Sequence, residues 1–187
     1  FVSEIPSVRR VDVVIKNAAG RARRLEGLDD KNSVFFGDIP EGAISVPMNG
    51  AIYKADVISG QKTGLFYDQR QNHKFVASLA GGKAVLDVFC HVGGFGLAAI
   101  AAGASNVSFV DSSASALELV GVGAAEMKKS DNINTIRGDA FAVMKELANS
   151  DHFYDIVICD PPAFVTSRNS LQSGLRAYEK MAKLASS

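Results

Sequence analysis

Four apolar segments of this chain each run into an aspartate, at Asp87, Asp111, Asp139 and Asp160, and stretches with helical character separate them. Strands that alternate with helices form a parallel sheet with right-handed crossovers. The carboxyl ends of such strands lie along one edge, where open α/β sheets bind their ligands. The sequence therefore predicts an α/β fold with part of a doubly wound, Rossmann-like sheet and a row of carboxylates along one rim.

The last of these aspartates begins the turn Asp160-Pro161-Pro162-Ala163-Phe164, directly after the apolar run 154–159. Each proline fixes its own φ at about −65° and restricts the residue before it. A rigid turn of this kind would hold one carboxylate beside an aromatic face, an arrangement that suits a flat polar ring. Taken alone, an acid followed by two prolines also ends strands for reasons of turn geometry only.

A glycine-rich turn follows the first of the four strands. Residues 84–88 are apolar apart from Asp87. Gly93, Gly94 and Gly96 follow, and residues 97–102 are rich in alanine. Glycines at such a turn let the backbone approach a ligand, and the helix start offers free N–H groups. The spacing differs from the dinucleotide-binding G-x-G-x-x-G pattern, and an acid at Asp87 suits a ligand with an amine end. The alternative is that the glycines only allow close packing of helix on sheet.

The second and third aspartates suggest further ligand contacts. Asp111 ends a short strand about twenty residues beyond the glycine turn, where doubly wound folds bind a ribose diol, and serines follow it. Asp139 stands just before the apolar-periodic segment 141–147. It has the position of a helix N-cap, and it could also accept a hydrogen bond from an adenine amino group, so both roles stay open.

On these residues the chain resembles the class I S-adenosylmethionine-dependent methyltransferases. Within that class it is similar to bacterial large-subunit (23S) rRNA methyltransferases that modify carbon 5 of cytosine, which have relatives acting on guanine. The resemblance lies in the Gln-Lys-Thr-Gly and Asp-Gln-Arg segment at 61–70, in the loop 87–95, in Asp111 and in the turn 160–164. The family usually carries Tyr-Thr where this chain has His91-Val92.

The resemblance implies S-adenosylmethionine as the cofactor and a base of ribosomal RNA as the substrate. Asp87 and the glycines would hold the methionine part, Asp111 the ribose, and Asp139 with Ala140 the adenine. Asp160 would be the catalytic residue beside the methyl group, with Pro161, Pro162 and Phe164 contacting the base. The complete set of expected cofactor contacts is Arg70, Asp87, Phe89, Gly93, Gly94, Phe95, Asp111, Ser112, Asp139 and Ala140. Arg70 has an equally simple alternative as a surface arginine paired with an acid.

Methylation of cytosine carbon 5 generally requires a cysteine that adds to the neighbouring ring carbon. The chain has only Cys90 and Cys159, and Cys159 lies in an apolar strand where a thiol behaves as a small hydrophobe. The resemblance places the nucleophile after a later strand, so we expect it beyond Ser187 and expect this stretch alone to be inactive. Methylation of an exocyclic amine or a guanine nitrogen is the enzymatic alternative, and a non-catalytic nucleotide- or RNA-binding module is the other.

The first 59 residues have a different pattern, in which β-prone segments are separated by short turns. Asn49-Gly50 lies between the β-prone segments 43–48 and 51–56, and a second turn at 17–20 lies between 8–16 and 21–25. We expect a small antiparallel β-hairpin module at 1–59 and an incomplete methyltransferase domain at 60–187. The arginines of the module could meet phosphates, although neighbouring acids favour a solvated face. Their positions are Arg9, Arg10, Arg21, Arg23 and Arg24.

Composition limits the function classes without selecting one. The 187 residues carry no formal net charge, which disfavours tight, sequence-blind nucleic-acid binding by this stretch alone. Neither cysteine belongs to a Cys-x-x-Cys pair and the three histidines lie on unlike segments, so we expect no metal site. The same cysteine usage fits a reducing compartment, and we expect a cytoplasmic protein that does not enter a membrane.

Overall fold

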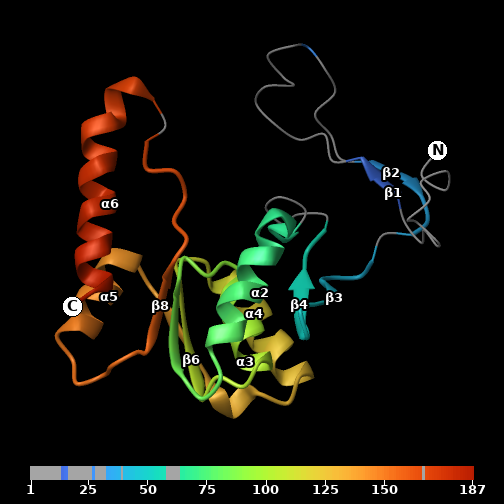
Figure 1. Ribbon diagram of the computed structural model, residues 1–187. Coiled ribbons are helices and arrows are strands. Elements are labelled where there is room, and N and C mark those ends of the chain that lie inside the picture. The colour runs from blue at the N-terminus through green and yellow to red at the C-terminus, as the bar shows by residue number, and fades with distance from the viewer. Residues whose placement is uncertain (1–13, 17–26, 28–32, 39, 58–63, 166) are drawn as a thin grey trace. The chain divides into compact units, whose positions relative to one another are not determined.

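The computed structural model describes residues 14–16, 27, 33–38, 40–57, 64–165 and 167–187 (Figure 1). The chain forms two compact units, one from Phe1–Ile44 with Asp56–Gly64 and one from Ser45–Ala55 with Leu65–Ser187. Residues 45–55 thus group with the second unit, whereas the sequence suggests a division between residues 59 and 60. The domain boundary itself stays a prediction.

The first unit contains a two-stranded antiparallel sheet. β1 (Val14–Lys16) pairs with β2 (Ser33–Phe36), with Ile15 opposite Val34. Antiparallel pairing is therefore present in this part of the chain. The strand predicted at 21–25 and the arginine clusters lie outside the described residues.

The second unit is built on a parallel sheet of four strands in the order β7-β6-β5-β8. The strands are β5 (Ala84–Val88), β6 (Asn106–Asp111), β7 (Ile133–Arg137) and β8 (Ile156–Cys159). One helix follows each strand: α3 (Gly94–Ala101), α4 (Ala114–Glu126), α5 (Ala140–Ala148) and α6 (Leu171–Ala185). The predicted α/β fold with strands and helices in alternation is confirmed.

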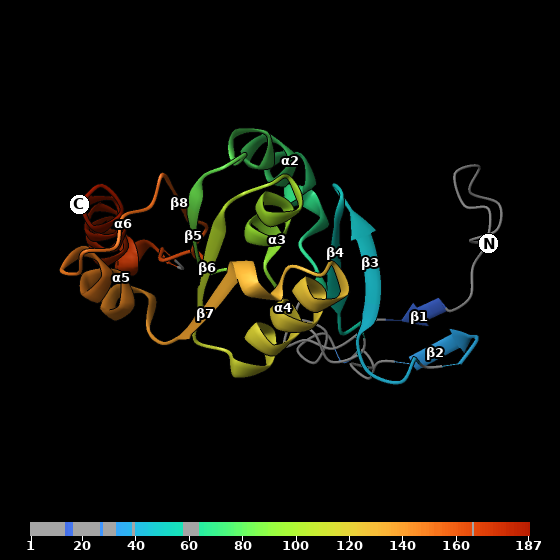
Figure 2. The same ribbon diagram turned by 90° about the horizontal axis from the view of Figure 1, so that it is seen from below.

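Helices cover both faces of this sheet. Figures 1 and 2 show α5 and α6 on one side, with α3, α4 and the preceding helix α2 (Arg70–Leu79) on the other. Side chains in β5 and β6 alternate between the two cores: Val85 and Phe109 on one face, Leu86 and Val110 on the other. Parallel strands buried on both faces read as continuous apolar runs, which explains why polar residues stand out at their ends.

A hairpin packs beside the helices of the same unit. β3 (Ile44–Met48) and β4 (Ala51–Ala55) are joined by Asn49-Gly50, whose positive φ values of 53° and 79° match the turn expected from the sequence. β4 lies against α3 and α4, and its alternate residues Ala51, Tyr53 and Ala55 are buried. Gly123 permits this approach, because a Cβ there would lie 2.6 Å from the Ile52 carbonyl oxygen.

Candidate functional site

The four aspartates stand at the carboxyl ends of the parallel strands, as the sequence predicts. Asp87 is the fourth residue of β5, Asp111 ends β6, Asp139 follows β7 by two residues, and Asp160 comes directly after β8. β5 lies between β6 and β8 in the sheet, so Asp87 has an acid on either side. The carboxylates of Asp160 and Asp111 both act to raise its pKa.

Asp87 is the most unusual side chain of this edge. It is 1% exposed, its Oδ2 accepts a hydrogen bond of 2.7 Å from the Gly96 amide, and its Oδ1 is buried without a partner. Burial raises its pKa to about 7, against the opposing effect of the Gly96 N–H. Buried acceptors nearly always have partners. An unpartnered carboxylate oxygen here suits a ligand that brings an N–H or a positive charge.

The loop between β5 and α3 has a constrained backbone. Phe89 and His91 have φ values of 62° and 51°, and Gly93, the N-cap of α3, lies in the left-handed region with a φ of 83°. The Cys90 amide donates to the Val110 carbonyl at 3.1 Å, and the His91 amide donates to Asp111 Oδ2 at 2.8 Å. The end of β6 thereby holds the loop that follows β5.

The glycines of this loop also serve packing. A Cβ at Gly93 would lie 3.0 Å from Leu97 Cγ and 3.1 Å from a Phe109 ring carbon, and a Cβ at Gly96 would enter the Phe109 ring. The packing alternative raised by the sequence therefore holds for these two positions. It is compatible with a ligand role, since the same turn leaves the Asp87 carboxylate at the loop.

Asp111 organises the start of α4 as well as the loop. Its Oδ1 accepts from the Ser113 amide at 2.9 Å, while its Oδ2 binds the His91 amide. Each carboxylate oxygen has a second lone pair, so both retain capacity for a ribose diol. The neighbouring Ser112 is exposed, and its carbonyl accepts from Arg137 Nε at 3.4 Å.

Asp139 is the N-cap of α5, because its Oδ1 accepts from the Ala142 amide at 3.0 Å. The N-cap interpretation is thus confirmed, and the contact with adenine stays a prediction. The Asp139 side chain is exposed, whereas the side chain of Ala140 belongs to the core between the sheet and α5.

Two buried residues that the sequence reasoning missed support the glycine loop. Tyr53 of β4 donates its hydroxyl to the Gly94 carbonyl at 2.9 Å. The His73 ring of α2 lies edge-on to Phe95 at 4.5 Å, and a Cβ at Gly94 would be 2.8 Å from its Nε2. Burial lowers the pKa of His73 to about 4, and its Nδ1 has no partner. Two features of the sequence could have identified them as buried: Tyr53 stands at an alternate position of β4, and His73 precedes the buried Ala77 by four residues, one turn of α2.

The segment that carries much of the family resemblance lies next to this loop. Residues 61–63 are outside the described part, but Phe66 packs edge-on against His91 with 5.4 Å between ring centroids. Burial lowers the pKa of His91, so its ring stays neutral at pH 7. Arg70 is exposed at the start of α2, and its carbonyl accepts from the Asn49 side chain at 2.8 Å.

The turn after β8 lies beside an aromatic cluster. Asp160 is exposed and its amide donates to the Val88 carbonyl at 3.4 Å, while Pro161 is half-buried and Pro162 is exposed. The Phe164 ring contacts three other rings, with centroid distances of 4.7 Å to Tyr178, 5.7 Å to Phe141 and 6.2 Å to Phe89. Phe164 is therefore partly enclosed by aromatic neighbours, and its contact with a base stays a prediction.

Neither cysteine is activated. Burial is the main cause that raises the pKa of both thiols, to about 11 for Cys159 and further for Cys90, and the Asp87 carboxylate acts in the same direction. A thiol is nucleophilic only as the thiolate. Both side chains are therefore protonated and poorly reactive at neutral pH.

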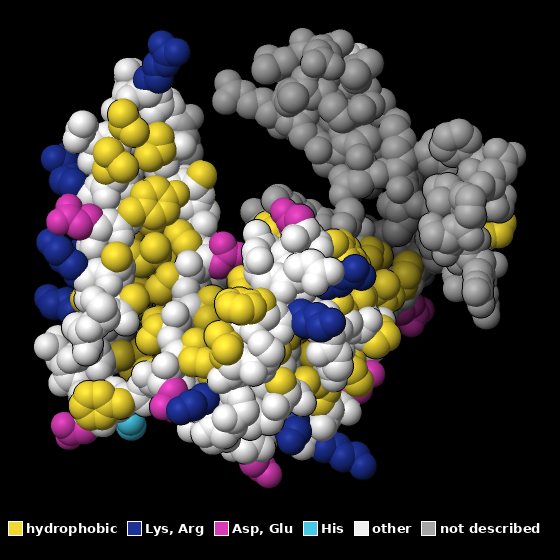
Figure 3. All heavy atoms as spheres, in the orientation of Figure 1, with side chains coloured by type: hydrophobic (Ala, Val, Ile, Leu, Met, Phe, Trp, Pro, Cys, Tyr) yellow, Lys and Arg dark blue, Asp and Glu magenta, His cyan; other side chains and the backbone are white. Residues whose placement is uncertain are grey.

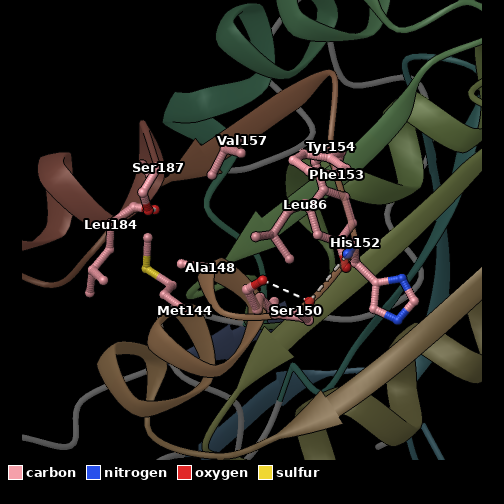
Figure 4. Close-up of a pocket in the computed structure, with 12 residues that line it drawn as sticks. Leu86, Met144, Ala148, Ser150, His152, Phe153, Tyr154, Val157, Leu184 and Ser187 are labelled. Carbon is pink, nitrogen blue, oxygen red and sulfur yellow. Dashed lines mark hydrogen bonds between the residues drawn. The ribbon is translucent and has the colours of Figure 1, made fainter.

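A cavity of about 100 Å³ lies elsewhere in the unit (Figure 4). Its walls come from α5, from the loop that precedes β8 and from the last turn of α6, so it is at the amino end of β8 and not at the acidic edge. Among the described residues, no group of three or more His, Cys, Asp or Glu side chains is placed to hold a metal ion. No helix in the same residues is long and apolar enough to cross a membrane.

The sequence is similar to those of known methyltransferases. Residues 24–184 match the family model for S-adenosylmethionine-dependent methyltransferases. The "Ribosomal RNA large subunit methyltransferase I" of Photobacterium profundum is 35% identical over 164 residues, which are 87% of this chain and 41% of that protein. The protein of the same name from Aeromonas hydrophila is 35% identical over 166 residues, 87% of this chain and 42% of its own length. The chain thus spans about two fifths of these relatives.

The fold is similar to those of solved methyltransferase structures. SMU.776, solved as a complex with SAH, has a TM-score of 0.65 and 27% identity, over 73% of this chain and 37% of that one. The S-adenosylmethionine-dependent methyltransferase from Agrobacterium tumefaciens has a TM-score of 0.67 and 20% identity, over 84% and 49% of the two chains. The match of the family model over most of the sequence is decisive: the chain belongs to the S-adenosylmethionine-dependent methyltransferases.

Proposed function

We propose that this chain binds S-adenosylmethionine along its acidic edge and that the protein transfers the methyl group to a base of large-subunit ribosomal RNA. The observation that carries the proposal is the buried Asp87, which keeps one oxygen without a partner beside a glycine loop that Asp111 anchors. The names of the relatives support the choice of ribosomal RNA as the substrate.

The residues of the edge fit the cofactor by their chemistry. The amino end of the methionine part would supply the donor that Asp87 Oδ1 lacks. Asp111 would accept from the ribose hydroxyls with its remaining lone pairs, and the exposed Asp139 carboxylate would accept from the adenine amino group. Phe89, Phe95, Ser112, Ala140 and Arg70 are the further cofactor contacts that we propose.

The cofactor supplies an activated methyl group, and its transfer to a base is an in-line displacement that depends mainly on alignment. Asp160 would stand beside the methyl group and the base. Pro161 and Pro162 would hold its backbone in one conformation, since neither has rotational freedom about φ. The chain's own contribution would therefore be to orient two ligands at one edge of the sheet.

For the methylated atom we propose carbon 5 of a cytosine in 23S rRNA, following the resemblance of the 61–70 segment. Neither Cys90 nor Cys159 would supply nucleophilic assistance, because burial holds both side chains as thiols. The same observation favours a second candidate, methylation of an exocyclic amine or a guanine nitrogen. Transfer to such an atom requires no covalent adduct with the enzyme.

Calorimetry with S-adenosylhomocysteine on the full-length protein tests the cofactor site. We expect binding to the wild type and weaker binding to Asp111→Ala, and absence of binding at millimolar ligand would reject the site. Mass spectrometry of digested rRNA from cells that lack and regain the protein then locates the methyl group. Methyl on cytosine carbon supports the first target, methyl on nitrogen supports the second, and RNA binding without any labelling indicates a non-catalytic module.

A further inference from the structure

α6 is attached to the sheet by one half only. Met181, Leu184 and Ala185, near its carboxyl end, pack against the core formed by β5, β6 and α5. Its amino-terminal half instead lies beside the segment that connects β8 to α6, as Figure 1 shows. Leu171 and Leu175, in this half, are 46% and 51% exposed. The helix thus reaches from the core to the proposed substrate turn.

The contact between α6 and this turn is close and specific. Gly174 is the buried residue of α6, and a Cβ there would lie 3.0 Å from the carbonyl carbon and oxygen of Phe164 and inside the contact distance of Val165. One helical turn later, the Tyr178 hydroxyl accepts a hydrogen bond of 3.3 Å from the Phe164 amide. Residues four apart lie on the same face of a helix, so Gly174 and Tyr178 both contact Phe164.

The same contact extends to the cofactor loop. The Phe164 ring lies between Tyr178 of α6 and Phe89, with centroid distances of 4.7 Å and 6.2 Å. Phe89 is the first residue after β5 and has the positive φ of the constrained loop. A shift of Phe164 would therefore displace the turn that carries Asp160 relative to Phe89 and the cofactor loop. Figure 3 shows apolar side chains continuing along α6 in the direction of the sheet.

We infer that Gly174 and Tyr178 are positioning residues for methyl transfer, which set the place of the Asp160–Phe164 turn relative to the cofactor loop. The inference rests on the proposed function. Gly174 acts by absence of a side chain, because any Cβ would push α6 away from the Phe164 backbone. Tyr178 acts through its hydroxyl on the Phe164 amide and through its ring on the Phe164 ring. Neither residue touches the reacting atoms.

The test uses the full-length protein and three variants: Tyr178→Phe, Gly174→Ala and the control Tyr154→Phe. The control variant also removes a single hydroxyl contact, the 3.0 Å hydrogen bond from Tyr154 to Ser108. This contact lies near the amino end of β8, away from the Asp160–Phe164 turn. For Tyr178→Phe we expect kcat to fall about three- to tenfold, the value of one hydrogen bond. For Gly174→Ala we expect about a 100-fold fall, since a misplacement near 1 Å has this effect on transfer. In both, the Kd for S-adenosylhomocysteine should stay within about twofold of the wild type.

Hydrogen exchange gives a readout that a loss of global stability would not reproduce. In Tyr178→Phe residues 160–165 should exchange faster while the strands of the sheet keep their protection. The inference is overturned if Tyr178→Phe and Tyr154→Phe have the same kcat, or if their exchange at 160–165 is the same. A wild-type protein that binds no cofactor overturns the proposed function instead, so the two failures are distinguishable.

Discussion

The ionisation of Asp87 should control cofactor affinity. Its pKa of about 7 means that about one tenth of the folded molecules carry the carboxylate at pH 6 and about nine tenths at pH 8. The unpartnered Oδ1 accepts an amine donor best in the ionised form. If only that form binds, the Kd for S-adenosylhomocysteine should improve about tenfold from pH 6 to pH 8, and binding at pH 6 should release close to one proton.

Calorimetry at pH 6, 7 and 8, in two buffers with different ionisation enthalpies, measures both quantities. Asp87→Asn is the matched variant, because it keeps the size of the side chain and removes its titration. We expect weaker binding by this variant and no proton release that originates from residue 87. Asp111 and Asp160 face the same edge and raise the pKa of Asp87 through their charge. Asp160→Asn should therefore move the pH midpoint of binding downward.

Two results would refute this reasoning. If the wild-type Kd does not change between pH 6 and pH 8, the Asp87 carboxyl does not contact the amine end of the cofactor. If Asp87→Asn keeps the full pH dependence, the titrating group is another one, such as the amino group of the ligand. Neither result would affect the assignment of the fold.

Further predictions concern stability and the contacts around the loop. Because the pKa of Asp87 is raised from 3.8 to about 7 on folding, the free energy of unfolding of the apo protein should fall by about 3 kcal/mol between pH 4 and pH 7, and urea titrations of Asp87→Asn should lack this part of the fall. Asp111→Ala should weaken cofactor binding by about 1–3 kcal/mol, measured by calorimetry, and unchanged affinity would remove Asp111 from the site. Gly96→Ala should lower the free energy of unfolding by about 1–3 kcal/mol, because the added Cβ enters the Phe109 ring. Gly103→Ala is the control: nothing lies within 4 Å of the added Cβ, so this variant measures only the cost of a positive φ, here +96°, for a residue with a side chain. Tyr53→Phe removes the hydroxyl that donates to the Gly94 carbonyl and should lower the free energy of unfolding by about 0.5–1.5 kcal/mol; an unchanged free energy of unfolding would contradict a stabilising role of this contact.

The arrangement of the acids could be predicted from sequence because it follows from topology. Apolar runs that end in Asp87, Asp111 and Asp160 identify parallel strands, and parallel strands place their carboxyl ends at one edge. The Asn49-Gly50 hairpin and the helix 171–185 were also predictable, since each depends on neighbours in sequence. Long-range side-chain contacts were not. Nothing near Tyr53 in sequence indicates that its hydroxyl reaches Gly94, 41 residues away.

Phe164 combines two roles, a predicted contact with the base and an observed packing contact with neighbouring rings. The sequence places an aromatic ring after two prolines and suggests a face for a flat base. In the structure this ring packs against Phe141 and Tyr178, so much of its surface is already used. Aromatic pairs of this kind add about 0.5–1.5 kcal/mol beyond burial, enough to hold a turn in place. The ring therefore links the substrate turn to α5 and α6, and the orientation of Asp160 depends on packing as well as on Pro161 and Pro162. A sequence pattern identifies such a turn, but the direction in which the turn points also depends on the packing of the helix beside it.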